Sequence, residues 1–223
     1  MEALTGREPF IVHPDGLGWL FVPAGLVDGP LPAHYEPQET PFENPLYTQQ
    51  QNPLRQRFDR EENLYNPDAS DVFPYVVTSY RLTEHHTAGG MSRTVRYLSE
   101  LQPELFCEVS PELAEERGLA HGEWATIATM RSAIEARVMV TDRMKPLTVQ
   151  GRTVHQVGLP YHWGKRGVVT GDTVNDLFSL ALDPNVHIQE VKAATCDIRS
   201  GRRPRGKALL ELVEEYRRKA APA

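Results

Sequence analysis

Hydrophobic positions from Phe73 onward come in short runs whose spacing predicts strands. The run YVVTSY at 75–80 is rich in β-branched and aromatic residues, which favours a strand. Ile134, Ala136, Val138 and Val140 alternate with Glu135, Arg137 and Met139, so one face of the segment 134–140 is apolar. A similar run at 124–128 precedes this alternating segment, and the residues around Arg131 lie between the two. Together the two runs predict a hairpin.

Three further strands extend this pattern, at 104–110, 153–163 and 191–198. Short helices or polar loops separate the strands, and no internal repeat is present. Several short strands with one or two helices between them indicate a mainly β chain of the α+β class. We therefore expect a small mixed β-barrel.

Two helices are predicted from end signals and spacing. Ser110 is a typical helix N-cap, Pro111 suits the first helical position and Gly118 suits the end, so a short helix is expected between them. A second helix is expected at the C-terminus, over 206–220. Its apolar stripe would be formed by Leu209, Leu210, Val213 and Tyr216.

The first 70 residues differ in composition from the rest of the chain and contain ten of its 18 prolines. Proline removes a backbone donor and favours extended geometry in the residue before it. Apolar side chains such as Tyr35 and Phe42 recur along the segment, which predicts a strap lying across another surface. A disordered linker is the alternative, although such segments are usually poor in aromatic residues. We divide the chain into this strap, 1–70, and a barrel domain with its C-terminal helix, 71–223.

Charge and composition exclude several functional classes. A net charge of -6 and a pI near 5.8 argue against a nucleic-acid-binding protein. No apolar run reaches the roughly 18 residues of a membrane helix, so no direct membrane span is expected. The N-terminus lacks the layout of a signal peptide, which favours the cytoplasm for this chain taken by itself. Cys107 and Cys196 match no metal-ligand spacing and are expected to be structural thiols.

The candidate chemistry lies in polar loops that follow strands. The loop 79–93 holds two arginines, the pair His85-His86 and two adjacent glycines, and glycine permits close approach of the backbone to a ligand. Adjacent histidines on a strand face opposite ways and no HExxH or CxxC motif accompanies them, so a protein-ligated metal is not expected. No GxSxG elbow supports a hydrolase. A solvated surface loop remains the plain alternative.

Two later stretches, 159–178 and 183–198, each combine a polar loop with the end or start of a strand and have the same character. A GKR and a TGDT sequence occur in the first of them, but without the spacing of a phosphate-binding P-loop. Three polar loops at strand ends fit a large ligand that carries phosphates and hydrogen-bonding rings. Arginine and lysine would bind the phosphates, while asparagine and histidine would contact ring edges.

At this point a family resemblance emerges. The segment TSYRLTEHHTAGGMSR at 78–93 resembles the loop that opens the C-terminal domain of molybdenum- or tungsten-dependent formate dehydrogenase large subunits. The segment 117–143 is similar to the next family stretch, with Glu123 where Asp is usual. The strap sequence at 28–46 is also typical of this branch. Late loops of the family are matched at the characteristic positions Asn175, Asp183, Pro184 and Lys192.

The resemblance implies a double-psi-like six-stranded β-barrel that binds part of a bis(molybdopterin guanine dinucleotide) cofactor with Mo or W. It implies formate oxidation to CO2 by the complete enzyme, with the catalytic and iron-sulfur residues on other domains and no catalytic residue or metal ligand here. Implied partners are the N-terminal part of the large subunit and an iron-sulfur electron-transfer subunit. The implied cofactor-binding residues are Arg81, Leu82, His85, His86, Thr87, Met91, Ser92, Arg93, His162, Trp163, Asn175 and Lys192.

Two other functions remain open. One is a related molybdopterin oxidoreductase of the nitrate reductase type, against which the strap and the loop at 79–93 argue. The other is a stand-alone module that carries or protects the cofactor, which tight binding by the chain without a partner would favour. The sequence is compatible with Mo or W, with selenocysteine or cysteine at the active site of other domains, and with export or membrane association of a full complex.

Overall fold

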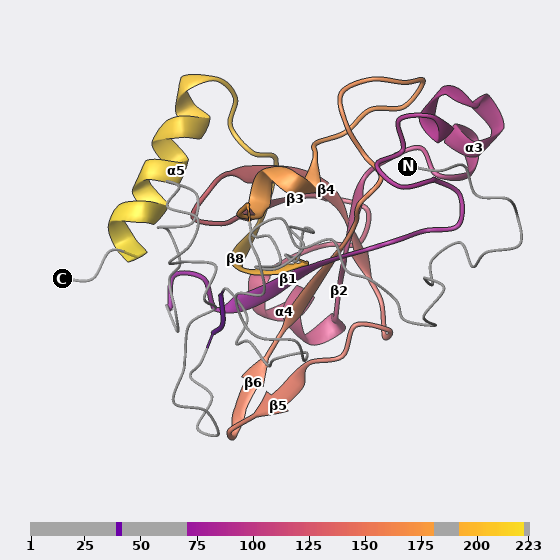
Figure 1. The fold of residues 1–223 in the computed structure, drawn as a ribbon. Coiled ribbons are helices and arrows are strands. Elements are labelled where there is room, and N and C mark those ends of the chain that lie inside the picture. Colours follow the sequence, from indigo (N-terminus) through magenta and orange to yellow (C-terminus); the bar gives the residue numbers. More distant parts are fainter. Residues whose placement is uncertain (1–38, 42–70, 181–191, 221–223) are drawn as a thin grey trace, which may run out of the picture.

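The structure is a computed structural model that describes residues 39–41, 71–180 and 192–220 (Figure 1). Most of the predicted strap lies outside the described residues, as do Asp183 and Pro184.

Six strands close into one barrel, in the order β1-β7-β2-β4-β3-β8. Two neighbouring pairs, β1 with β7 and β2 with β4, are parallel, and the other pairs are antiparallel. Because the barrel is closed, each of its six strands is paired on both sides. This confirms the predicted six-stranded mixed barrel. The strands are β1 (Tyr75–Tyr80), β2 (Phe106–Val109), β3 (Trp124–Ala128), β4 (Ala133–Val140), β7 (Gln156–Pro160) and β8 (Ala193–Ser200).

The barrel interior is filled by alternate side chains of these strands. Val77, Cys107, Ile127, Val157 and Ile198 are fully buried. The predicted alternation of 134–140 is confirmed, because Ile134, Ala136 and Val138 belong to this core and Val140 packs against it. Both cysteines are free and buried, and burial raises the pKa of the Cys107 thiol to about 12, which keeps it protonated and unreactive at neutral pH.

The strand expected at 153–163 divides into two pieces at His155. β6 (Arg152–Val154) pairs with β5 (Leu147–Val149) in a small hairpin outside the barrel, whereas β7 pairs with β1 inside it. The turn between β5 and β6 is Gln150-Gly151, and both residues have positive φ, as a two-residue hairpin turn requires. In Figure 1 this hairpin projects from the barrel.

Helix α4 (Pro111–Arg117) forms where it was predicted. The Ser110 hydroxyl accepts a hydrogen bond from the Leu113 amide at 3.1 Å, and Gly118 ends the helix with φ 60°. The sequence did not lead us to predict α3 (Arg96–Leu101), which follows the short 3-10 helix η1 (Ser92–Thr94). No helix among the described residues is long and apolar enough to cross a membrane.

Helix α5 (Lys207–Ala220) packs on the turn between β3 and β4, against Ala128 and Ala133. The predicted apolar stripe is wrong at one position, because Leu210 is 66% exposed. Leu212 is buried in its place. The stripe that packs on the barrel is therefore Leu209, Leu212, Val213 and Tyr216, which has regular helical spacing.

One described piece of the strap, residues 39–41, contacts the barrel. The Glu39 carboxylate accepts hydrogen bonds from the amide and the hydroxyl of Thr195 on β8, at 2.8 and 2.9 Å. It also forms an ion pair with Arg131 in the turn between β3 and β4, and the two side chains are only 2% and 4% exposed. A buried ion pair thus joins the strap to the barrel.

Candidate functional site

The predicted polar loops gather at one end of the barrel because of its strand directions. β1 and β7 are parallel, so the loops that follow them begin side by side, and the Tyr161 amide donates to the Tyr80 carbonyl at 3.0 Å. β8 is antiparallel to β1, so Lys192, just before β8, lies at the same end. The Ser79 amide donates to the Lys192 carbonyl at 3.0 Å.

Two cations flank one aromatic ring at this end. The Arg81 guanidinium carbon lies 4.1 Å from the centroid of the Tyr161 ring, and the Lys192 ammonium nitrogen lies 5.7 Å from it. Both cations are exposed, and neither forms an ion pair with a described residue. The tyrosine orients the two side chains by cation–π attraction and leaves their N–H donors available. Tyr161 was not among the predicted site residues, although an aromatic residue directly after a strand was a usable signal.

Asn175 belongs to the same end through a different contact. It lies in the 3-10 helix η2 (Val174–Leu177), where the Leu177 carbonyl accepts a hydrogen bond from the Thr129 hydroxyl at 3.0 Å. Thr129 directly follows β3, which is antiparallel to β8, so the end of β3 points toward the barrel end at which β8 begins. The exposed Asn175 side chain is therefore at the barrel end that carries Arg81 and Lys192.

His162 is a fully buried connection between the two loops. Its Nε2 accepts a hydrogen bond from the Leu82 amide at 2.6 Å, so the ring proton is on Nδ1, which donates to the Thr87 carbonyl at 2.5 Å. Burial lowers the pKa of His162 below its ordinary value. The nearby His85 and Arg81 lower it further, against the opposing effects of the Thr87 carbonyl and Glu84. The imidazole is thus neutral and holds the backbone of the loop at 81–88.

Acidification should loosen this loop. The pKa of His162 is lower in the folded chain than its ordinary 6.5, so the unfolded chain binds more protons between the two values. Stability from this group is therefore complete above pH 6.5 and falls as the pH decreases toward the lowered pKa. We expect faster amide hydrogen exchange in 81–95 at pH 5.5 than at pH 7.5, after correction for intrinsic rates.

The variant His162→Gln is the control, because glutamine also has a donor and an acceptor but does not titrate in this range. An equal pH response in the wild type and in this variant would assign the effect to other groups.

Arg93 is a second connection between the same loops. Its buried guanidinium donates to the carbonyls of Ala88 and His162, both at 2.5 Å, and to that of Arg166 at 2.9 Å. Three carbonyl acceptors from two loops fix their separation. Arg93 therefore has a positioning role in this structure, and its direct contact with a cofactor stays a prediction.

The glycine pair of the loop has two different environments. Gly89 has φ 74°, and a Cβ atom there would lie 2.0 Å from the His162 carbonyl oxygen. Gly90 has no such neighbour within 4 Å. The close approach inferred from the sequence is thus an approach of Gly89 to the second loop.

Three further predicted residues lie behind the loop. His85 is buried, with its ring nitrogens 3.1 Å from the Ser92 hydroxyl and 3.0 Å from the Gln102 carbonyl. Its ring packs edge-on against buried Trp163, with centroids 5.2 Å apart. The predicted residues therefore form two groups. Leu82, His85, Ser92, Arg93, His162 and Trp163 support the loops, whereas Arg81, His86, Thr87, Met91, Asn175 and Lys192 are exposed.

The exposed group can bind an anionic ligand with polar rings. Two cations, an imidazole, a hydroxyl and an amide supply donors for phosphate oxygens and for ring edges. In the described part of the chain, no group of three or more His, Cys, Asp or Glu side chains is placed to hold a metal ion.

Comparison with known proteins identifies a matching family and several relatives. The family described as "Molydopterin dinucleotide binding domain" matches residues 75–195. The chain is 41% identical over 195 residues to formate dehydrogenase 2 subunit alpha (cytochrome c-553) of Nitratidesulfovibrio vulgaris. It is 39% identical over 197 residues to the nitrate-inducible formate dehydrogenase major subunit of Escherichia coli.

Both alignments cover 87% of this chain but only 19% of the relative, so the chain spans about a fifth of the length of these curated relatives. Among solved structures, acetylene hydratase from Pelobacter acetylenicus is similar with a TM-score of 0.46 and 13% identity, over 77% of this chain and 21% of that one. The family match covers more than half of the chain, which therefore belongs to the molydopterin dinucleotide binding domain family.

Proposed function

We propose that this chain is the part of a formate dehydrogenase large subunit that holds a bis(molybdopterin guanine dinucleotide) cofactor for oxidation of formate to CO2. The observation that carries this proposal is the convergence of Arg81, Lys192 and Asn175 at one barrel end, from three segments far apart in the sequence. Similarity to formate dehydrogenase subunits over most of the chain supports it.

The residues at this end suit the groups of such a cofactor. Arg81 and Lys192 present charged donors to phosphates, while His86 and Asn175 suit the edges of pterin or guanine rings. The neutral His162 and the buried Arg93 keep the loops in place without adding an exposed charge of their own. When bound, the molybdenum or tungsten centre of the cofactor supplies the redox chemistry.

Other domains must complete the enzyme under this proposal. The described residues offer no cluster of metal ligands, and the relatives are about five times longer than the aligned segment. The catalytic residues and the iron-sulfur ligands are assigned to the N-terminal part of the large subunit, with an iron-sulfur subunit as the electron-transfer partner. The chain by itself is expected to bind the cofactor weakly and to show no formate-dependent dye reduction.

Removing either cation should release the cofactor. In the complete enzyme, Arg81→Ala and Lys192→Ala each delete a charge-assisted contact that contributes on the order of 2 kcal/mol, which corresponds to roughly thirtyfold weaker binding. The measurement is the amount of guanine nucleotide and of Mo or W retained per protein through dialysis. We expect faster loss of both from each variant than from the wild type.

The matched control is Arg152→Ala, which removes an exposed arginine from β6 in the hairpin outside the barrel. It should retain cofactor as the wild type does. Unchanged retention in both Arg81→Ala and Lys192→Ala would contradict the assignment of this barrel end. Full, tight loading of the chain without any partner would instead favour a stand-alone cofactor-carrying module.

A further inference from the structure

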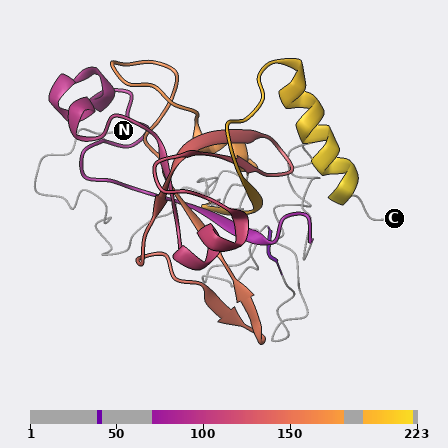
Figure 2. The same ribbon diagram turned by 180° about the vertical axis from the view of Figure 1, so that it is seen from behind.

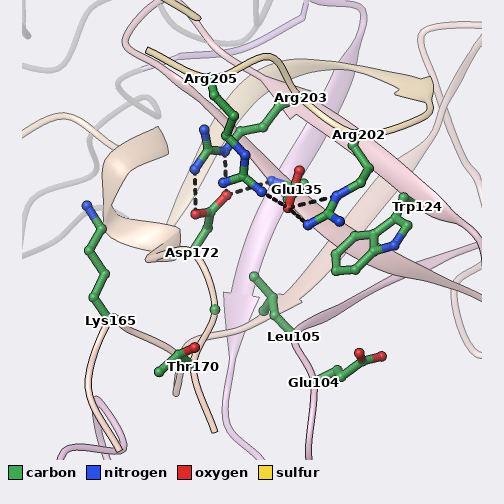
Figure 3. A pocket seen from close by; sticks show the side chains of 11 residues that line it. Glu104, Leu105, Trp124, Glu135, Lys165, Thr170, Asp172, Arg202, Arg203 and Arg205 are labelled. Atoms are coloured by element: carbon green, nitrogen blue, oxygen red, sulfur yellow. Dashed lines mark hydrogen bonds and ion pairs between the residues drawn. The ribbon is translucent and has the colours of Figure 1, made fainter.

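A pocket of about 410 Å³ lies on the outer wall of the barrel and shares the loop after β7 with the site described above (Figure 3). Its floor is formed by β3 and β4, and its sides are formed by the segment 202–205 after β8 and the loop 165–172. The residues that line it are mostly polar or charged. They are Glu104, Leu105, Trp124, Glu135, Lys165, Thr170, Gly171, Asp172, Arg202, Arg203 and Arg205.

One arginine of this pocket, Arg203, is neutralised by an ion pair within the protein. Arg203 forms a two-pronged ion pair with Asp172, at 2.6 and 2.8 Å, and both side chains are largely buried. Asp172 also accepts a hydrogen bond from the Glu135 amide at 3.0 Å. Burial raises the pKa of Asp172, but the Arg203 hydrogen bond and the Glu135 amide outweigh it, and the net pKa is lowered. This ionised pair fixes the loop against β4.

The other two arginines are only partly neutralised. Arg202 and Arg205 donate to the same Glu135 oxygen, Oε1, at 2.6 and 2.5 Å. Burial raises the pKa of Glu135, but these two guanidinium groups lower it more, so the carboxylate is ionised. The single negative charge of Glu135 thus pairs with both arginines, and the side chains of Arg202 and Arg205 remain 55% and 59% exposed. Lys165 adds a further exposed cation and forms no ion pair with a described residue.

The free guanidinium donors are held in place. The Arg202 carbon lies 4.4 Å from the centroid of the Trp124 ring, so cation–π attraction adds to its contact with Glu135. Figure 3 shows Arg202 and Arg205 meeting at Glu135, with Lys165 across the pocket. Each arginine has five N–H donors, and Arg202 and Arg205 use only some of them on this carboxylate.

We propose that this pocket binds the phosphate group of a small phosphorylated molecule, with Arg202, Arg205 and Lys165 as its charged contacts. Preorganised guanidinium groups with surplus positive charge are the usual recognition chemistry for phosphate. The volume is within the range of small-molecule pockets, which leaves room for an organic part such as a sugar. The Thr170 hydroxyl and the Glu104 carboxylate offer hydrogen-bonding groups for that part.

The site is separate from the proposed cofactor end. Trp124 begins β3 and Arg202 follows the end of β8. Because β3 and β8 are antiparallel, the start of β3 and the end of β8 lie together, whereas Lys192 precedes the start of β8. Only the loop after β7 contributes to both places, with Tyr161 and His162 at one and Lys165 to Asp172 at the other.

Isothermal titration calorimetry of the full chain with ribose 5-phosphate tests the proposal, with ribose and inorganic phosphate as comparison ligands. We expect binding of ribose 5-phosphate that weakens with added salt, weaker binding of inorganic phosphate and none of ribose. Arg205→Ala and Lys165→Ala should each weaken binding about tenfold or more. Arg152→Ala, remote from the pocket, should bind as the wild type does.

Absence of ribose 5-phosphate binding, or equal affinity in Arg205→Ala, overturns the proposal. Equal affinity for inorganic phosphate and ribose 5-phosphate overturns the assignment to an organic phosphate. Cofactor retention by the complete enzyme separates this inference from the proposed function. Arg205→Ala should retain the cofactor normally, and loss of the cofactor from this variant would make the pocket part of the cofactor site and overturn its independence.

Discussion

Replacing Glu39 with alanine is expected to lower the free energy of unfolding by about 3–5 kcal/mol. The Glu39 carboxylate is buried against Arg131 and accepts two hydrogen bonds from Thr195. Its removal leaves the Arg131 guanidinium in a buried place without this counter-charge, and it leaves the Thr195 donors without their acceptor. Urea unfolding followed by circular dichroism measures the change.

Two further variants separate charge from general disruption. Glu39→Gln keeps an acceptor for Thr195 but loses the charge, so its cost should be smaller than that of Glu39→Ala. Glu211→Ala removes an exposed carboxylate that lies 3.5 Å from Lys207, and it should cost no more than about 0.5 kcal/mol. Similar small effects at Glu39 and Glu211 would show that the strap contact contributes little to stability in solution.

Gly89→Ala is expected to destabilise the chain by about 3 kcal/mol. The left-handed backbone of Gly89 costs about 1–2 kcal/mol for a residue with a side chain. Steric overlap adds about 1–3 kcal/mol, because the new Cβ atom would meet the His162 carbonyl oxygen at 2.0 Å and an Arg93 nitrogen at 2.6 Å. The neighbouring atoms are backbone and a buried guanidinium, which have little freedom to move aside.

Gly90→Ala is a matched control from the next position. A Cβ atom at Gly90 meets nothing within 4 Å and its φ is not positive, so this variant should unfold like the wild type. Thermal unfolding and hydrogen exchange in the loops at 81–95 and 161–171 report the difference. Equal behaviour of the two variants would mean that the loops do not pack as closely as the structure shows.

Local signals in the sequence were enough to predict several elements. Ser110 and Gly118 predicted the two ends of α4 correctly, and the alternation in 134–140 identified the hairpin and its inward face. These features depend on neighbours in the sequence, so a pattern reveals them. The exposure of Leu210 was missed because Leu210 and Leu212 each fit a helical stripe with Leu209 and Val213 almost equally well. Packing against Ala128 and Ala133 buries Leu212 and leaves Leu210 exposed.

Which of the predicted site residues support the loops, and which are exposed, could not be predicted from local patterns. His162 and Arg93 are polar residues in polar loops, and the sequence alone suggests that they contact a ligand. Apart from the Ala88 carbonyl, which is five residues from Arg93, their partners are backbone groups 69 to 80 residues away, and only closure of the barrel brings them together. The charged wall pocket was also missed, because the run at 202–205 resembles an ordinary solvated basic segment until its contacts with Glu135 and Asp172 are known.

The turn of the β5–β6 hairpin is a suitable position for attaching a label. It leads into the start of β7, while the loops of the candidate site follow the end of that strand, so the whole length of β7 separates the two. The turn Gln150-Gly151 is exposed and stands clear of the barrel (Figures 1 and 2). A fluorophore or an affinity tag attached at this turn would report on binding of another protein to the chain while leaving the candidate site untouched.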